Sequence, residues 1–153
     1  MKNLHSEITI AASPEAVWKV LSDFAAYPAW NPFIINISGK QTEGEKLAVM
    51  LRPPEKSPMT FKPRILKWKE YSEFRWLGRV GIRGVFDGEH YFQLEPTDDG
   101  ETRFIHGENF SGILLPLLWG SLKSNTFAGF EAMNIALKEV VESGILSPPD
   151  VTE

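Results

Sequence analysis

Alternation of apolar and polar residues dominates the chain and predicts seven β-strands. Alternation with a period of two places every second side chain on the same face of a sheet. The predicted strands cover residues 4–12, 33–38, 46–52, 60–69, 73–80, 85–95 and 102–112. The six strands after residue 33 are joined by short segments that carry Gly, Pro or polar turn residues. Short links between consecutive strands are typical of an antiparallel meander.

The last two predicted strands carry an unusual inward face. A three-residue loop at Asp98–Gly100 would pair residues whose numbers sum to about 198. The predicted pairs are Leu94 with Phe104, Phe92 with His106, and His90 with Glu108. A face that mixes aromatic rings with ionisable groups indicates one wall of a partly hollow interior.

Two regions of the sequence favour helices. Ser13-Pro14-Glu15 begins the first, because serine is a good N-cap and proline is tolerated at the first helical position. The prolines that follow Tyr27 and Asn31 limit the next helix to a single short turn. Apolar residues at helical spacing predict a long last helix from about Leu114 to Ser143. About 30 residues at 1.5 Å each give about 45 Å, enough to cross a whole curved sheet.

Small residues in the middle of the last helix, namely Ala128, Gly129 and Ala132, favour some empty space beside it. Glycine costs about 1 kcal/mol in a helix relative to alanine, so Gly129 is expected to have a packing reason. At the start of this helix, the leucine-rich run from Ile113 to Trp119 either caps a cavity or leaves an exposed apolar patch for dimerisation. We expect the cap.

Composition and charge narrow the class of protein. The 153 residues fit one domain, which we place at residues 1–146, with residues 147–153 as a frayed tail. A net charge of −4 gives no basic field for nucleic acid, and the absence of cysteine excludes disulfides and thiolate metal sites. No apolar segment is long enough for stable membrane insertion and no signal peptide is recognisable, so we expect a cytoplasmic monomer or homodimer. No metal or other cofactor is expected.

The order of these elements resembles the START-like (SRPBCC) superfamily, and within it the polyketide cyclase/dehydrase and lipid-transport group. The resemblance covers residues 4–143. The segments that carry it are Ser13–Trp18, Phe24–Phe33, Phe74–Gly78 and Thr102–Gly112. It implies an α+β helix-grip fold, in which a seven-stranded antiparallel sheet curls around one long C-terminal helix, with two short helices after the first strand. It also implies that an apolar ligand is held between sheet and helix.

Aromatic side chains and a few polar ones are the candidates for a ligand-binding wall. The predicted set is Tyr27, Trp30, Phe33, Phe61, Trp76, His90, Phe92, Phe104, His106, Glu108, Phe110, Phe127, Phe130 and Asn134. Within it, His90, His106 and Glu108 could orient a ligand, transfer protons, or only satisfy one another inside the hairpin. Asn134 lies one position past the apolar stripe of the last helix, where it could contact a ligand or be solvated. The glycine-rich turn Gly78–Gly84 is interpreted as a lip at the mouth of the pocket.

These features favour binding or carriage of a small apolar ligand, aromatic or acyl-chain, in a cavity between sheet and long helix. One alternative is a cyclase or dehydratase that acts on a polyketide-like substrate with a His/Glu proton shuttle. Another is a protein-interaction module whose cavity is occluded. The sequence leans away from an enzyme and assigns no catalytic residue outright.

Overall fold

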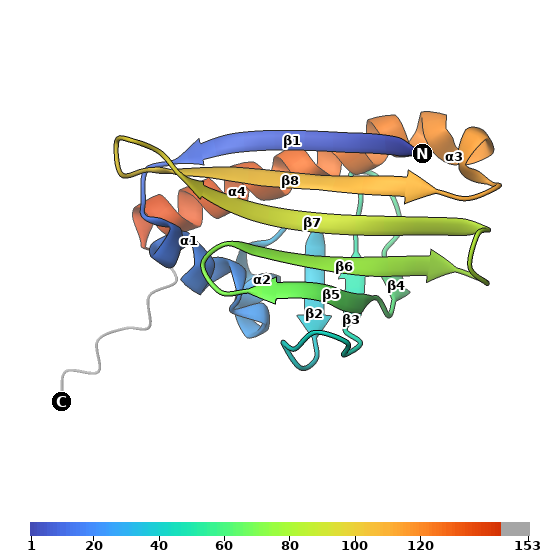
Figure 1. Cartoon of the computed structure of the whole chain (residues 1–153). Coiled ribbons are helices and arrows are strands. Elements are labelled where there is room, and N and C mark those ends of the chain that lie inside the picture. Colours follow the sequence, from blue (N-terminus) through green and yellow to red (C-terminus); the bar gives the residue numbers. More distant parts are fainter. Residues whose placement is uncertain (145–153) are drawn as a thin grey trace.

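The protein forms two antiparallel sheets with a long helical segment across the larger one (Figure 1). The computed structural model describes residues 1–144. The larger sheet has the strand order β1-β8-β7-β6-β5, and the smaller has the order β2-β3-β4. The strands are β1 (Lys2–Ile10), β2 (Ile34–Ser38), β3 (Ala48–Leu51), β4 (Met59–Phe61), β5 (Arg64–Lys69), β6 (Glu73–Val80), β7 (Phe86–Pro96) and β8 (Thr102–Ser111).

Eight strands replace the seven predicted ones, because the expected strand 60–69 is divided in two. Pro63 falls between β4 and β5, and proline has no N–H to donate to a sheet ladder. The chain bends at Pro63, but residues 63 and 64 still pair with the segment that precedes β3. An isolated bridge pairs Lys46 with Arg64, and the Leu47 N–H donates to the Pro63 carbonyl at 2.8 Å. The predicted curled sheet is therefore present as two sheets joined at a corner.

The helices match the two predicted regions. The first region contains α1 (Pro14–Leu21), the 3₁₀ turn η1 (Phe24–Ala26) and the single turn α2 (Tyr27–Trp30). Ser13 caps α1, and its Oγ accepts from the Ala16 N–H at 3.2 Å. The second region is one helical run made of α3 (Leu115–Ser121), the π-helical segment η2 (Leu122–Thr126) and α4 (Phe127–Ser143). It ends at Gly144, which has a φ of 68°.

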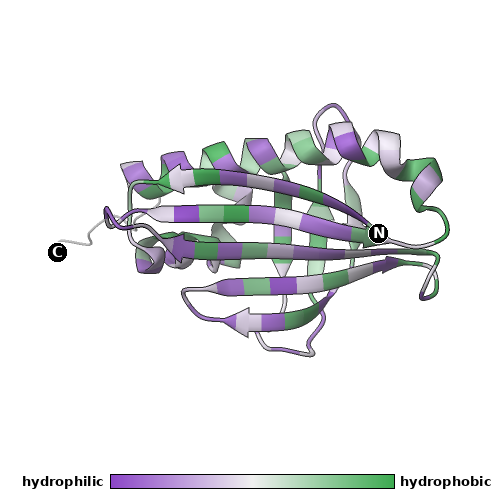
Figure 2. Cartoon of the chain, turned by 45° about the horizontal axis from the view of Figure 1, so that its top comes forward, coloured by the Kyte–Doolittle hydropathy of each residue, from purple (hydrophilic) through white to green (hydrophobic). Residues whose placement is uncertain are grey.

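The inward face of the larger sheet packs on α4 and forms the core. Apolar and polar residues alternate along its strands (Figure 2). The predicted hairpin register is confirmed: Leu94 pairs with Phe104, Phe92 with His106, and His90 with Glu108. The loop closes where Pro96 pairs with Thr102, and Gly100 has a φ of 79°. This register brings the polar residues of β7 and β8 to the centre of the sheet.

Gly129 does have a packing reason, but the reason is contact and not empty space. A Cβ atom at this buried position would overlap the ring of Phe33, which fills the place where a side chain would lie. The expectation of empty space is therefore wrong at Gly129. The glycine permits the close approach of Phe33 to α4.

The run from Ile113 to Trp119 does not cap the interior. Ile113 and Leu117 are 79% and 82% exposed, and only Leu115 is buried. The expectation of a cap is therefore wrong, and this run leaves an apolar ridge at the start of α3. Among residues 1–144, no helix is long and apolar enough to cross a membrane. The proposed tail, residues 147–153, lies outside the described residues.

Candidate functional site

Three neighbouring strands hold the candidate site in two successive rows of inward side chains. In the first row, Trp76 of β6 pairs with His90 of β7, which pairs with Glu108 of β8. In the next row across the sheet, Gly78 of β6 pairs with Gly88 of β7. Neither glycine has a side chain, so the Phe61 ring packs over Gly78 and the Glu108 carboxyl lies over Gly88, and a space beside these groups stays open.

A cavity of about 140 Å³ lies at this point. It lies between the end of the larger sheet, strands β3 and β4 of the smaller sheet, and the segment η2. Its lining residues are Phe33, Leu51, Pro53, Met59, Phe61, Gly78, Arg79, Val80, Phe86, Gly88, Glu108, Phe110, Leu122 and Thr126. Only three of these carry polar side chains, so the cavity suits an apolar molecule with a small polar part.

Glu108 is the carboxyl group of this cavity. Its side chain is only 15% exposed, and its Oε1 lies 2.5 Å from where a Cβ of residue 88 would be. Glycine at position 88 therefore makes room for the carboxyl over β7. The other two polar residues of the lining are Arg79 and Thr126. Unlike Glu108, Arg79 is 43% exposed, and its Nε lies 3.2 Å from Asp87.

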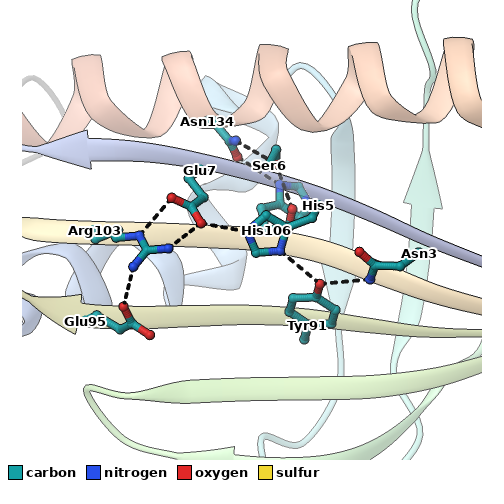
Figure 3. Close-up of polar contacts among 9 residues, drawn as sticks. All are labelled: Asn3, His5, Ser6, Glu7, Tyr91, Glu95, Arg103, His106 and Asn134. Atoms are coloured by element: carbon teal, nitrogen blue, oxygen red, sulfur yellow. Dashed lines mark hydrogen bonds and ion pairs between the residues drawn. The ribbon is translucent and has the colours of Figure 1, made fainter.

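A buried polar chain leads from Glu108 into the core. Oε2 of Glu108 lies 3.4 Å from Nδ1 of His90, and Nε2 of His90 lies 2.7 Å from Nε2 of His106. Nδ1 of His106 lies 2.9 Å from Oδ1 of Asn134. The Asn134 amide then donates to the Ser6 hydroxyl at 2.9 Å, and that hydroxyl donates to the His106 carbonyl at 2.7 Å. Figure 3 shows the inner part of this chain, in which the amide joins a side chain of β1 to one of β8.

Burial shifts the pKa values of these groups toward their neutral forms. It raises the pKa of Glu108 to about 8 and lowers that of His90 to about 3. The pKa of His106 is lowered well below its usual value by burial and then by the neighbouring His90. The site therefore holds an uncharged carboxyl and two uncharged imidazoles at neutral pH. Within residues 1–144, no group of three or more His, Cys, Asp or Glu side chains is arranged to hold a metal ion.

The residues predicted for the ligand-binding wall fall into three places. Phe33, Phe61, Glu108 and Phe110 line the cavity. The polar residues His90, His106 and Asn134 are buried behind it, at 1%, 0% and 3% exposure. The remaining predicted residues lie in the aromatic core or at its border, and they are Tyr27, Trp30, Trp76, Phe92, Phe104, Phe127 and Phe130.

Contacts within the core explain why the remaining predicted residues do not reach the cavity. Phe130 stacks on His106 at a centroid distance of 4.2 Å. Tyr27 is fully buried, and its hydroxyl donates to the Leu21 carbonyl. Trp76 lies behind Phe61 at a centroid distance of 6.4 Å.

Ten cavity residues are absent from the predicted set, and the two glycines could have been found. Gly88 lies two positions before His90, so the same alternation places both on the inward face, and Gly78 has the same relation to Trp76. Residues from the smaller sheet and the π-helical segment carry no comparable signal. Arg79 and Val80 do come from the glycine-rich turn interpreted as a lip of the pocket.

A second polar cluster lies on the outer face of the same strands, away from the cavity (Figure 3). Arg103 pairs with Glu7 and with Glu95, and the Arg103 guanidinium and then His5 lower the pKa of Glu7 to about 2. Tyr91 accepts from Asn3 at 3.1 Å on this face. Because these side chains lie on the opposite face of the sheet from His90 and His106, they do not contribute to the cavity.

Solved structures with the same fold are numerous. Protein TTHA0849 from Thermus thermophilus is 16% identical with a TM-score of 0.73, and the match covers 94% of this chain and 99% of that chain. The aromatase/cyclase ZhuI from a Streptomyces species is 14% identical with a TM-score of 0.67, over 94% of this chain and 97% of that chain. A START superfamily protein from Mycobacterium smegmatis is 20% identical with a TM-score of 0.65, over 92% of this chain and 97% of that chain.

These identities are low, so the solved structures show the fold alone, and no match was found among curated proteins. The fold that the START-like resemblance implies is confirmed by these neighbours. A family model described as polyketide cyclase/dehydrase and lipid transport matches residues 1–142, and the chain therefore belongs to that family.

Proposed function

We propose that the protein binds a small apolar molecule in the cavity between the larger sheet, the smaller sheet and the π-helical segment. The observation that carries this proposal is the cavity beside Gly78 and Gly88, which is walled mainly by apolar side chains and contains one buried carboxyl. The hydrophobic effect would supply the affinity, at roughly 25 cal/mol for each Å² of apolar surface removed from water. The membership of the family and the presence of an aromatase/cyclase among its structural neighbours support the proposal.

A blocking variant tests the location of the ligand. Leu122 lies on η2 and lines the cavity, so a tryptophan at this position would occupy the space. Leu118 lies one turn earlier, is 36% exposed and does not line the cavity, so Leu118→Trp is the matched control. Naphthol, decanol and decyl methyl ether serve as aromatic and alkyl probes in isothermal titration calorimetry. We expect Leu122→Trp to weaken binding at least about tenfold, or about 1.4 kcal/mol, and Leu118→Trp to leave it unchanged. Equal affinity in the two variants, or no binding of any probe, would contradict the proposal.

A second candidate function is ring closure or dehydration of a polyketide-like substrate, and the position of Glu108 favours it. His90 and His106 are too deeply buried to touch a ligand. Glu108 is therefore the titrating group of the buried polar chain that can exchange a proton with a ligand. In an aldol closure above about pH 8, where Glu108 is ionised, its carboxylate would take a proton from the carbon beside a carbonyl. The resulting enolate would add to a second carbonyl, and the alkoxide formed would recover the proton from Glu108.

Kinetics of a linear diketone with native protein and with Glu108→Gln separate this candidate from simple binding. An enzyme would form ring product faster than buffer does and lose the excess rate in the variant. A simple binding protein would retain the diketone unchanged in both cases.

A further inference from the structure

The hydrogen bonds of the buried chain all run in one direction, and their direction is fixed at the inner end. The His106 carbonyl oxygen can only accept, so the Ser6 hydroxyl donates to it. The Ser6 oxygen then accepts from the Asn134 amide nitrogen, which turns the amide oxygen toward His106. That oxygen also only accepts, so Nδ1 of His106 must carry a hydrogen.

The same reasoning passes through both imidazoles. A neutral His106 with a hydrogen on Nδ1 has a lone pair on Nε2, and this lone pair faces Nε2 of His90 at 2.7 Å. His90 must therefore carry its hydrogen on Nε2, which leaves a lone pair on its Nδ1. That lone pair faces Oε2 of Glu108 at 3.4 Å. An ionised carboxylate would place two unshared lone pairs against each other there.

The uncharged carboxylic acid form of Glu108, with its O–H on Oε2, removes this repulsion between lone pairs at 3.4 Å. Its other oxygen, Oε1, is then a carbonyl-type acceptor without a hydrogen. Oε1 lies in the space above Gly88, and both residues line the cavity. The raised pKa of Glu108 agrees with this assignment. The cavity thus presents a hydrogen-bond acceptor at its polar end.

We propose that the ligand is an uncharged apolar molecule with a hydroxyl at its buried end, and that this hydroxyl donates to Oε1 of Glu108. The inference deepens the proposed function and depends on it. A ligand that ends in a carboxylate would bring acceptor oxygens against an acceptor, so an alkyl carboxylate is rejected at this end. Arg79 is the cationic side chain in the lining. It is paired with Asp87 and partly solvated, so it does not compensate for the repulsion between a ligand carboxylate and Oε1.

Three probes of equal chain length test the hydroxyl requirement. Decanol offers a donor, decyl methyl ether offers only an acceptor, and decanoate offers a charged acceptor. In calorimetric titration of native protein at neutral pH, we expect decanol to bind at least tenfold more tightly than either of the others. Glu108→Gln should keep this preference, because its amide can donate to His90 and present its carbonyl oxygen to the cavity. Glu108→Leu should bring decanol and the ether to within about twofold of each other.

Each outcome of this experiment bears on one proposal or the other. Equal binding of decanol and the ether by native protein, or tightest binding of decanoate, would overturn the hydroxyl inference while the apolar cavity stands as a binding site. Binding of none of the three would overturn the proposed function and the inference with it. Infrared spectroscopy of native protein at neutral pH provides a test that requires no variant. A carboxylic acid C=O band that disappears in alkaline solution is expected, and its absence would overturn the protonated state of Glu108.

Discussion

Replacing Glu108 with glutamine is expected to remove a loss of stability that the native protein undergoes in alkaline solution. The pKa of Glu108 is about 8 in the folded protein, against 4.5 for an ordinary glutamate. Between these values the folded state holds one more proton than the unfolded state, so the free energy of unfolding falls as the pH rises. Glutamine has nearly the same shape, keeps a donor for His90 and does not ionise.

The magnitude follows from the two pKa values. From about pH 6.5 to about pH 9 the difference in proton binding integrates to about 1.5 pKa units, or about 2 kcal/mol at 1.36 kcal/mol per unit. The window begins at about pH 6.5 because His90 also changes the free energy of unfolding below that pH. Its pKa is lowered to about 3 in the folded state, whereas in the unfolded state it takes up a proton near pH 6.5. Below that value the free energy of unfolding falls again, because the unfolded imidazoles take up protons that the buried ones refuse.

Urea unfolding followed by tryptophan fluorescence, at several pH values and constant ionic strength, measures this difference. Native protein should lose about 2 kcal/mol relative to Glu108→Gln across the window. Because both proteins share all other titrating groups, subtraction of the two curves isolates Glu108. Parallel curves would refute the reasoning, since they would mean that the carboxyl is already ionised in the fold.

Three further substitutions test the packing and the polar chain. Gly129→Ala should destabilise the protein by about 1–3 kcal/mol, because a Cβ would overlap Phe33, whereas Gly120→Ala, which meets nothing within 4 Å, should be neutral or stabilising by up to about 1 kcal/mol. Chemical denaturation measures both, and equal effects would contradict the packing argument. Asn134→Ala should cost about 2–4 kcal/mol, because the buried Nδ1 of His106 loses its side-chain acceptor and the Ser6 hydroxyl loses its amide donor. Asn109→Ala on the outer face should cost under about 0.5 kcal/mol. Gly88→Ala should displace the Glu108 carboxyl and weaken decanol binding at least about tenfold in calorimetry, and unchanged affinity would show that Oε1 does not contact the ligand.

Much of the fold follows from local patterns that the sequence displays openly. Strict alternation on β7 and β8, with a loop of fixed length between them, determines the register, because a slip by one residue would turn the aromatic face to solvent. The long helix follows from apolar spacing and from Gly144. The break at Pro63 could also have been recognised, since a proline inside a predicted strand argues against a continuous ladder.

The location of the cavity could not be predicted in the same way, because it depends on where side chains are absent. Phe92, Phe104 and Phe130 have the composition expected of a pocket wall, yet they pack on one another and on His106. Ring-rich sequences fill space as readily as they enclose it, and only tertiary packing decides between the two. The role of Asn134 depends in turn on Ser6, a residue 128 positions away in the sequence.

The π-helical segment η2 gives the last helix a single extra residue in one of its turns, just where it faces the cavity. Removing one residue there would restore a regular helix and rotate α3 by about 100° relative to α4. Leu122 would then point elsewhere, while Phe130, Met133 and Leu137 would stay anchored. One wall of the chamber can thus be reshaped by a one-codon insertion or deletion, with the remainder of the scaffold left intact.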